Sequence, residues 1–433
     1  MNKTPQAPPP VELLDPLLQV PQTPSPMPET LPHVIEPSTR RAIFHLSFAT
    51  FASMTIQRLC DPMLPQLALD FQVERVQAAH VISFFAITYG FMQVLFGPLG
   101  DRYGKYRVLS LATLGCSLGC LGCALAWSLP FLVLCRVLTA TCTAAIIPLG
   151  LAWVGDTVHY QIRQETLAKV GLGSTMGIVA GQLVGGLLTD TLGWRWAFGA
   201  LCGVFFVVGW VLWSNPHARA QSHGQAHEAR GEVTLSFVAN AKAVLSKTRA
   251  RRLMGFIFLE GCVVFGALAI SATHLHDAQD LRVSLAGLIV ALFGLGGVIY
   301  MASAKWLIHR LGETQLIRCG TLSYGLAYAL IGFANVAWLD ALAFALAGFG
   351  FFMFHNTMQA LATQLDPERR GTCMALFACI LFGGQSLGVV ACSGLIPVIG
   401  SDWVMLLAGL LLTLIGLTLP IWVEVGRREG NYA

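Results

Sequence analysis

Two carboxyl groups and two guanidinium groups lie inside long apolar stretches of this sequence, where a charged side chain is costly. Glu260 lies about seven residues into its stretch, roughly 10 Å deep at the helical rise of 1.5 Å per residue. Its own stretch has no cation at helical spacing. A carboxyl buried in this way could bind and release a proton, so Glu260 is the best candidate for a proton carrier. Asp61 and Arg136 are further candidates for proton coupling.

Asp61 is separated from Arg58 by about one helical turn in the first apolar stretch. Two interpretations are open. The two side chains neutralise each other within the stretch, or they form a solvated pair near the outer interface. The second interpretation follows from the distance along the helix, because Asp61 lies about 18 residues, or roughly 27 Å, beyond Ile43.

Polar side chains in a later stretch could bind a solute. His355 and Gln359 lie one turn apart on a common helical face, and Asn356 follows His355. These groups could line a cavity and donate hydrogen bonds to cargo, or they could form a polar cluster that bridges helices. The further candidates for the cavity are Arg58, Gln182 and Gln385.

Metal ligation and enzyme chemistry are weaker interpretations. Cys116, Cys120 and Cys123 share a helical face and could hold Cu(I), but cysteines in apolar runs are more typical of packing. The segment from His274 to Asp277 and the histidines of residues 215–252 resemble metal ligands only faintly. The sequence has no Walker loop, nucleophile elbow or zincin motif. We therefore expect no metal, no cofactor and no enzymatic activity.

The composition indicates a membrane protein. The chain has 433 residues, of which 55% are hydrophobic and 12% are charged, and its mean hydropathy is +0.65. A typical soluble domain has about 25% charged residues. Twelve helices of about 20 residues would use roughly 240 residues, which the apolar content can supply, but a large soluble domain is then excluded. The net charge of +4 is small, so nucleic acid is not an expected partner.

The apolar runs predict an all-α membrane protein with twelve transmembrane helices in two six-helix bundles. The predicted spans start near residues 43, 77, 107, 130, 168, 197, 253, 283, 314, 337, 372 and 401. The predicted parts are a disordered Pro-rich cytoplasmic tail over 1–41, bundles over 42–214 and 253–425, a cytoplasmic linker over 215–252, and a cytoplasmic tail over 426–433.

The linker contains a helical pattern of apolar residues with basic residues beside it. Because such a helix can lie on anionic lipid, we expect an interfacial helix within 215–252. The apolar residues of this pattern are Phe237, Val238, Ala241, Val244 and Leu245.

The distribution of Lys and Arg predicts the orientation. If both termini are cytoplasmic, 22 of the 27 basic residues lie on the inner side, and only Arg75, Arg195 and Arg282 lie outside. Such an asymmetry is typical of the positive-inside rule. We therefore expect both termini in the cytoplasm.

The two halves of the chain contain corresponding residues, which is typical of transporters built from parallel repeats. Arg102 corresponds to Arg310 and Gly104 to Gly312, each 208 residues further along the chain. Gly177 corresponds to Gly383, 206 residues further along.

The segment 97–105, with the sequence GPLGDRYGK, closely resembles the loop signature of the major facilitator superfamily. Its glycines, Gly97 and Gly104 among them, permit a sharp turn and close helix approach. The resemblance implies that Asp101 and Arg102 stabilise the outward-facing state as a latch at the inner gate, with Arg310 and Gly312 in the matching loop. An ordinary topology signal would explain the basic residues but not Asp101.

Further segments resemble the drug:proton antiporter branch of this superfamily, over residues 42–425. Arg136 is similar to the buried arginine of the fourth helix. Small residues four apart permit helices to cross closely. The glycines that resemble the antiporter motif are Gly177, Gly181, Gly185 and Gly186. Gln182 stands where that motif usually has proline.

The resemblance implies a secondary transporter of the bacterial inner membrane that exports a small organic solute in exchange for protons by alternating access. Its expected partners are the solute, protons and membrane lipids, and we expect a monomer. Gln182 leaves open an importer or uniporter of a small metabolite. A receptor that has the fold but does not transport is a further alternative.

Overall fold

The structure of the chain, a computed structural model, describes residues 37–158, 160–216, 218, 233–366 and 368–428, and it contains helices and no strand in these ranges. This confirms the predicted all-helical class. The N-terminal helices, here called the N half, are α1 (Pro37–Arg58), α2 (Leu64–Asp70), α3 (Arg75–Ala78), α4 (His80–Tyr103), α5 (Lys105–Ala124), α6 (Leu129–Thr143), α7 (Ile146–Thr157), α8 (Tyr160–Thr191) and α9 (Trp194–Trp213). After α11 (Val233–Ser246), the C half consists of α12 (Thr248–Glu260), the π-helix η1 (Gly261–Phe265), α13 (Gly266–Gln279), α14 (Val283–Phe333), α15 (Ala337–Thr363), α16 (Arg370–Ile399) and α17 (Ser401–Arg428).

Ten helices in the described ranges are long and apolar enough to cross a membrane. One of them, α14, has 51 residues and is interrupted by the non-helical backbone of Gly312, so it consists of two helices in sequence. The 22-residue helix α1 is not among the ten. Every predicted span start falls inside a helix. The number twelve itself stays a prediction.

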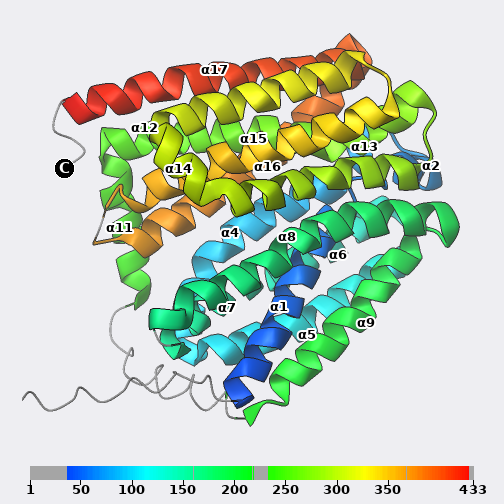
Figure 1. Cartoon of the computed structure of the whole chain (residues 1–433). Helices are drawn as coiled ribbons and strands as arrows, with labels where there is room; N and C mark the ends of the chain where they lie inside the picture. The colour runs from blue at the N-terminus through cyan, green and yellow to red at the C-terminus, as the bar shows by residue number, and fades with distance from the viewer. Residues whose placement is uncertain (1–36, 159, 217, 219–232, 367, 429–433) are drawn as a thin grey trace, which may run out of the picture. The chain divides into compact units, whose positions relative to one another are not determined.

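The helices of each half pack mainly against one another. In Figure 1 the blue to green helices of the N half gather together, and the yellow to red helices of the C half gather beside them. Two pairs of helices make the main contacts between the halves, α8 with α14 and α4 with α16. These four helices therefore form the interface at which the halves can move against each other.

Helix α11 lies within the predicted linker and packs on the C half. Val244 is buried in the core of that half, and Ala241 and Leu245 pack against the same core. Val238 is 72% exposed. Part of the predicted apolar face is thus covered by protein, while contact with lipid stays a prediction. The linker histidines His217, His223 and His227, and residues 1–36 of the predicted tail, lie outside the described residues.

A buried carboxylate fixes α11 and the start of α12 to the loop between α15 and α16. Lys247 donates to Asp366 Oδ2 over 2.9 Å, and Arg369 Nε donates to Asn240 Oδ1 over 3.0 Å. Arg369 also donates to Asp366. The cations Lys247 and Arg369 hold the pKa of Asp366 below its usual range, because both stabilise the ionised carboxylate.

Glycines with positive φ mark corresponding turns in the two halves. Gly104 (φ 91°) separates α4 from α5, and Gly312 (φ 69°) interrupts α14. Gly193 (φ 94°) precedes α9, and Gly400 (φ 86°) precedes α17. L-residues with a side chain rarely adopt this backbone conformation. The two pairs are 208 and 207 residues apart, which agrees with the predicted internal repeat.

In the N half, α8 approaches the backbone of α1 through a row of glycines. A Cβ atom at Gly177 or Gly185 would overlap the carbonyl oxygen of Phe51 or Leu59, respectively. Gly181 lies against Thr55 in the same way. Gly186 faces the other side and touches the backbone at the start of α14. Three glycines of the antiporter-like motif therefore pack on α1 and the residue that follows it, and the fourth, Gly186, packs on the C half.

The C half repeats this packing between α16 and the α12–η1 segment. Gly384 lies against the carbonyl of Phe258, and Gly388 lies against the carbonyl of Cys262. Gly384 and Gly388 follow Gly177 and Gly181 by 207 residues. Their partners Phe258 and Cys262 follow Phe51 and Thr55 by the same number. The predicted match of Gly177 with Gly383 was therefore wrong by one residue. The physical reason is that Gly383 faces open space, whereas Gly384 makes the close contact.

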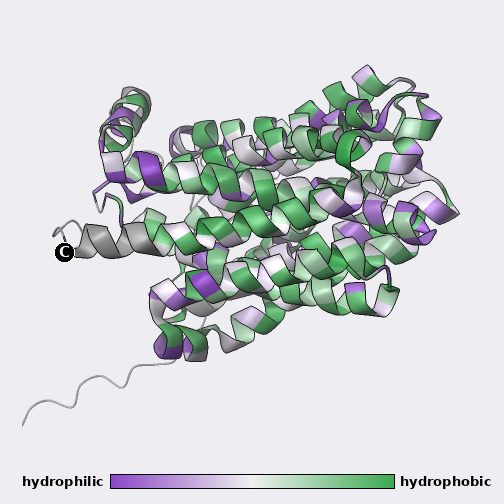
Figure 2. Cartoon of the chain, turned by 90° about the horizontal axis from the view of Figure 1, so that it is seen from above, coloured by the Kyte–Doolittle hydropathy of each residue, from purple (hydrophilic) through white to green (hydrophobic). Residues whose placement is uncertain are grey.

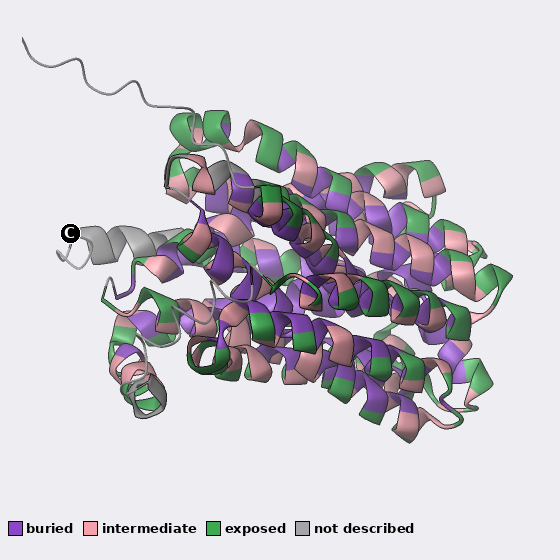
Figure 3. Ribbon diagram, turned by 90° about the horizontal axis from the view of Figure 1, so that it is seen from below, coloured by how far each residue is buried: buried purple, intermediate pink, exposed green. Residues whose placement is uncertain are grey.

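Many large apolar side chains lie on the outside of the helices. Among them, Leu118 and Trp127 are each 72% exposed, and Val398 is 75% exposed. Figure 2 shows hydrophobic residues along the length of the helices, and Figure 3 shows that exposed residues lie on their outer sides. A surface of this kind suits lipid tails, because helices satisfy their backbone hydrogen bonds internally. The chain is therefore a multi-pass membrane protein.

The glycine contacts of α16 predict a sharp difference between two adjacent residues. Replacing Gly384 by Ala should destabilise the protein by about 1–3 kcal/mol, the cost of overpacking, because the new methyl would overlap the Phe258 carbonyl. Replacing Gly383 by Ala should be neutral or stabilising by up to about 1 kcal/mol, because Ala favours the helix. Thermal unfolding of both purified variants measures the difference, and equal melting temperatures would contradict the close contact.

Candidate functional site

The predicted proton carrier forms a buried pair with a histidine from another helix. Glu260 is the last residue of α12, and its Oε1 lies 2.7 Å from Nδ1 of His355 in the middle of α15. Glu260 is fully buried, whereas the His355 side chain is 15% exposed. The other carboxyl oxygen, Oε2, is buried and has no hydrogen-bond partner within the described residues. The pair therefore joins α12 to α15 through one short contact.

Aromatic rings fix the orientation of His355. Its ring stacks on Phe351 with the ring centres 5.0 Å apart, and the edge of Phe377 approaches at 5.5 Å. Phe351 and Phe377 are themselves buried in the core of the C half. The imidazole is therefore held by packing while one nitrogen faces Glu260.

A π-helical segment begins directly after Glu260. The segment η1 covers Gly261–Phe265 and separates α12 from α13. Gly261 packs against the carbonyl of Leu381 on α16. Gly266 packs against Gly388 on the same helix. Single π-helical turns in α-helices often occur at functional sites. Here the segment lies at the candidate proton site.

The N half contains a second buried ionisable pair. Arg58 at the end of α1 lies 3.6 Å from Asp61 Oδ2, and both side chains are buried. Gln182 of α8 donates a hydrogen bond to the same oxygen over 2.9 Å. Asp61 Oδ1 is buried without a hydrogen-bond partner in the described chain. Burial of both charges excludes the solvated alternative for this structure.

Arg136 connects three helices of the N half. From α6, it donates hydrogen bonds to the carbonyl oxygens of Ile56 on α1 and Val81 on α4, at 2.9 and 3.3 Å. Its guanidinium lies 4.0 Å from the ring centre of Phe85. It is also within electrostatic range of Asp61. These contacts indicate that Arg136 positions the helices around Asp61.

The predicted amides of the cavity lie in different environments. Asn356 is half-buried, whereas Gln359 is exposed. Gln385 is buried, and its backbone nitrogen lies near Gly261. Gln182 contacts Asp61, an ionisable residue predicted from the sequence.

The loop motif forms its ion pairs within the N half. Lys105 lies 3.4 Å from Asp101 and 2.5 Å from Asp156 at the end of α7. Arg102 lies over the ring of Tyr103, its own neighbour. In the described ranges no ion pair joins this loop to the C half, and Gly97 faces open space. Sequence reasoning did not identify Asp156, because helix packing brings it to the loop from 51 residues away.

The matching loop of the C half lies within α14. Arg310 lies over the ring of Trp306 on its own helix, at 5.5 Å, and Gly312 makes the turn. The latch between the two loops stays a prediction.

The halves are in contact at the opposite end of the helices. Arg75 forms an ion pair with Asp277. Nearby, the backbone nitrogen of Ser284 donates to Asp190 over 2.6 Å. Deeper in the molecule, the hydroxyl groups of Ser83 on α4 and Ser386 on α16 lie 2.7 Å apart. We call this the Asp277 end and the other the Gly104 end, so the structure is closed at the Asp277 end.

The weaker metal hypotheses gain no support from the geometry. In the part of the chain that the structure describes, no three His, Cys, Asp or Glu side chains are placed to hold a metal ion. His274 is buried, with its ring nitrogens 2.9 Å from Ser401 Oγ and 3.0 Å from the Ile331 carbonyl. His276 contacts the carbonyl of Leu281. These contacts fix the end of α13 to its neighbours.

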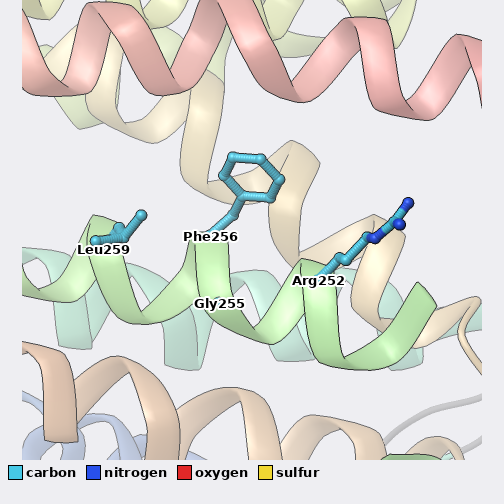
Figure 4. A pocket seen from close by; sticks show the side chains of 4 residues that line it. All are labelled: Arg252, Gly255, Phe256 and Leu259. Carbon is cyan, nitrogen blue, oxygen red and sulfur yellow. The ribbon is translucent and has the colours of Figure 1, made fainter. Parts of the chain in front are cut away.

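An apolar recess of about 300 Å³ lies on one side of α12. Figure 4 shows Phe256, Leu259 and Arg252 pointing into it from successive turns, with Gly255 between them. None of the residues predicted for the cavity lines this recess. We therefore place the candidate site at the two ionisable pairs.

Comparison with known proteins identifies the family of this architecture. A family model described as the Major Facilitator Superfamily matches residues 46–389. An uncharacterized MFS-type transporter, YwfA of Bacillus subtilis, is 25% identical over 285 residues, which are 65% of this chain and 68% of that protein. A proposed multidrug resistance protein, MdtD of Escherichia coli, is 26% identical over 330 residues, which are 76% of this chain and 64% of MdtD.

Solved structures show the same fold at low sequence identity. A single-residue mutant of the nucleoside transporter NupG has a TM-score of 0.73 and 12% identity, covering 87% of this chain and 98% of its own. A bacterial homolog of the human lysosomal transporter Spinster, in an inward-facing and unoccupied conformation, has a TM-score of 0.69 and 16% identity, covering 90% and 97%. The chain belongs to the Major Facilitator Superfamily of membrane transporters.

Proposed function

We propose that this protein is a proton-coupled secondary transporter that exports a small organic solute by alternating access. The observation that carries this proposal is the buried Glu260–His355 pair. A carboxyl in the membrane with one unpartnered oxygen is costly when charged, and such groups are typical of proton relays. The proposed partners are protons, the solute and membrane lipids, and the proposed location is the bacterial inner membrane.

The pair can exchange one proton with the medium in a balanced step. When Glu260 carries the proton, its O–H donates to His355 and both groups are neutral. When the proton leaves through the exposed part of His355, a carboxylate is left whose Oε2 is buried and unpartnered in the described residues. A solute with a donor group can then stabilise that carboxylate through Oε2. Proton and solute thereby compete for the same carboxyl group, which is the basis of exchange.

The closed Asp277 end fits one state of an alternating-access cycle. With the predicted orientation, the Gly104 end faces the cytoplasm, so this state is inward-facing. Rocking of the halves about α4–α16 and α8–α14 would open one end while closing the other. The loop with Asp101 and Arg102 would then approach the C half and act as the predicted latch.

Export of a drug-like solute is supported by the similarity to MdtD, whose name describes a proposed multidrug resistance protein. Proton-coupled import of a small metabolite is the second candidate. It is favoured by Gln182, which replaces the usual proline of the antiporter motif and donates to Asp61 instead. The direction of solute flux in vesicles with an imposed pH gradient distinguishes the two.

Replacing Glu260 by Gln should abolish proton-coupled transport and leave the protein folded, because the amide has similar shape but exchanges no proton. We expect proton release on addition of a solute panel to the purified wild type and none from Glu260→Gln. The control is Asp340→Asn, which alters another buried carboxyl, paired with Gln279 far from this site. Full proton-driven activity of Glu260→Gln would exclude Glu260 as the carrier.

Replacing Asp101 by Asn should slow turnover roughly five- to tenfold, the range of a weak coupling between conformational states. The reason is that the outward-facing state would lose a latch contact, while the structure in hand would lose only the pair with Lys105. Turnover in proteoliposomes is the measurement, with the exposed Glu368→Gln as the control. Unchanged turnover together with unchanged accessibility of both ends would refute the latch.

A disulfide between residues 83 and 386 should lock the Asp277 end closed. The two hydroxyl oxygens are 2.7 Å apart, so cysteines at both positions are close enough to bond. Oxidation of Ser83→Cys/Ser386→Cys should abolish transport, and a reductant should restore it. The single variant Ser83→Cys controls for the 12 native cysteines. Transport that continues in the cross-linked protein would show that this end need not open.

A further inference from the structure

One contact across the interface of the halves connects the Arg58–Asp61 pair to η1, the segment that follows Glu260. The guanidinium carbon of Arg58 lies 4.5 Å from the ring centre of Phe265, the last residue of η1. Both side chains are buried. Arg58 Nε has no hydrogen-bond partner in the described residues, and both Asp61 and the ring face help to offset the charge of the guanidinium. A cation over a ring is attracted more strongly when water is excluded.

From Phe265 a continuous series of ring contacts leads to the other pair. The edge of Phe265 approaches Phe351 at 5.3 Å, and Phe351 stacks on His355 at 5.0 Å. His355 in turn contacts Glu260. Glu260 and Phe265 are also joined through the chain, because they flank the four residues at the start of η1. The two pairs are thus linked both by packing and by the π-helical segment.

The internal repeat gives this contact a defined place in the fold. Phe265 follows Arg58 by 207 residues, the same separation as the glycine contacts of α8 and α16. The two residues therefore occupy equivalent positions in the two halves and meet where the halves face each other. A change in the packing of either half would act on this contact.

We propose that Phe265 is a positioning residue that couples the Arg58–Asp61 pair to the Glu260–His355 pair, so that a charge change in one pair alters the other. This inference rests on the proposed proton site. A π-helical turn holds one residue more than an α-turn. If removal of charge from Glu260 lets η1 return to α-helical geometry, the ring of Phe265 rotates away from Arg58. Arg58 is then held less firmly beside Asp61.

Other ionisable groups also surround these pairs. Arg136 acts electrostatically on Asp61, and Tyr328 of α14 acts on Arg58. The thiol of Cys60 lies near Asp61. His355 faces Glu260. All four are unchanged in the variants below, so their effects cancel in a double-mutant comparison.

The test is a double-mutant cycle on the full-length protein in lipid nanodiscs without any solute. Isotope-edited infrared spectroscopy follows the protonated carboxyl of Glu260, assigned by its absence in Glu260→Gln, from about pH 4 to about pH 9. We expect Asp61→Asn to shift the midpoint by about half a pH unit or more, roughly a threefold change in proton affinity. In the Phe265→Leu background the same change should have no effect, and Phe265→Tyr should restore it.

The matched control is Phe293→Leu, another buried ring that contacts Phe351 and has no cation over it among the described residues. If Phe293→Leu removes the coupling equally, or if the Asp61→Asn shift persists in Phe265→Leu, Phe265 is not the link and only this inference is overturned. If Glu260 does not titrate at all, the proposed proton site and this inference both fail. Phe265→Tyr keeps the ring, so a folding defect of Phe265→Leu does not decide the result.

Discussion

The cost of placing a charge in the membrane is the constraint on which this structure depends. Each buried charge has its partner on another helix or beyond its end. Asp61 accepts from Gln182, Arg136 donates to carbonyls of α1 and α4, and Glu260 contacts His355. Such contacts hold helices in register, because separating them would leave a charge without compensation. Two of the residues that fix the bundle, Asp61 and Glu260, are also carboxylic acids, whereas Arg136 keeps its charge.

Close helix packing makes these contacts possible. The glycines of α8 bring it against the backbone of α1, and in doing so place Gln182 next to Asp61. The glycines of α16 hold the segment around η1 in the same way, directly after Glu260. Because lipid tails offer no hydrophobic drive between helices, such close backbone contact is a main source of packing energy. The internal repeat uses it twice, at a spacing of 207 residues.

The sequence was sufficient to predict local features, and insufficient for contacts between helices. A helix at every predicted span start, the turns at Gly104 and Gly312, and the buried ionisable residues follow from apolar runs and residue types. The pairing of Glu260 with His355 did not, because 95 residues separate them and periodicity describes one helix at a time. The one-residue error at Gly383 has a related cause. Two adjacent glycines look alike in sequence, and only the neighbouring helix distinguishes Gly384.

The loop motif shows a different limit, since under the proposed cycle its residues serve more than one state. Lys105 bridges Asp101 and Asp156 within the N half while the halves are in contact at the Asp277 end. A protein that rocks between two arrangements must offer these charges a partner in each. An internal partner while the latch is open lowers the cost of breaking it, so that neither state becomes a trap. Under the proposed cycle, the motif therefore forms one set of contacts in this structure, which includes the pair of Lys105 with Asp156, and a different set in the outward-facing state.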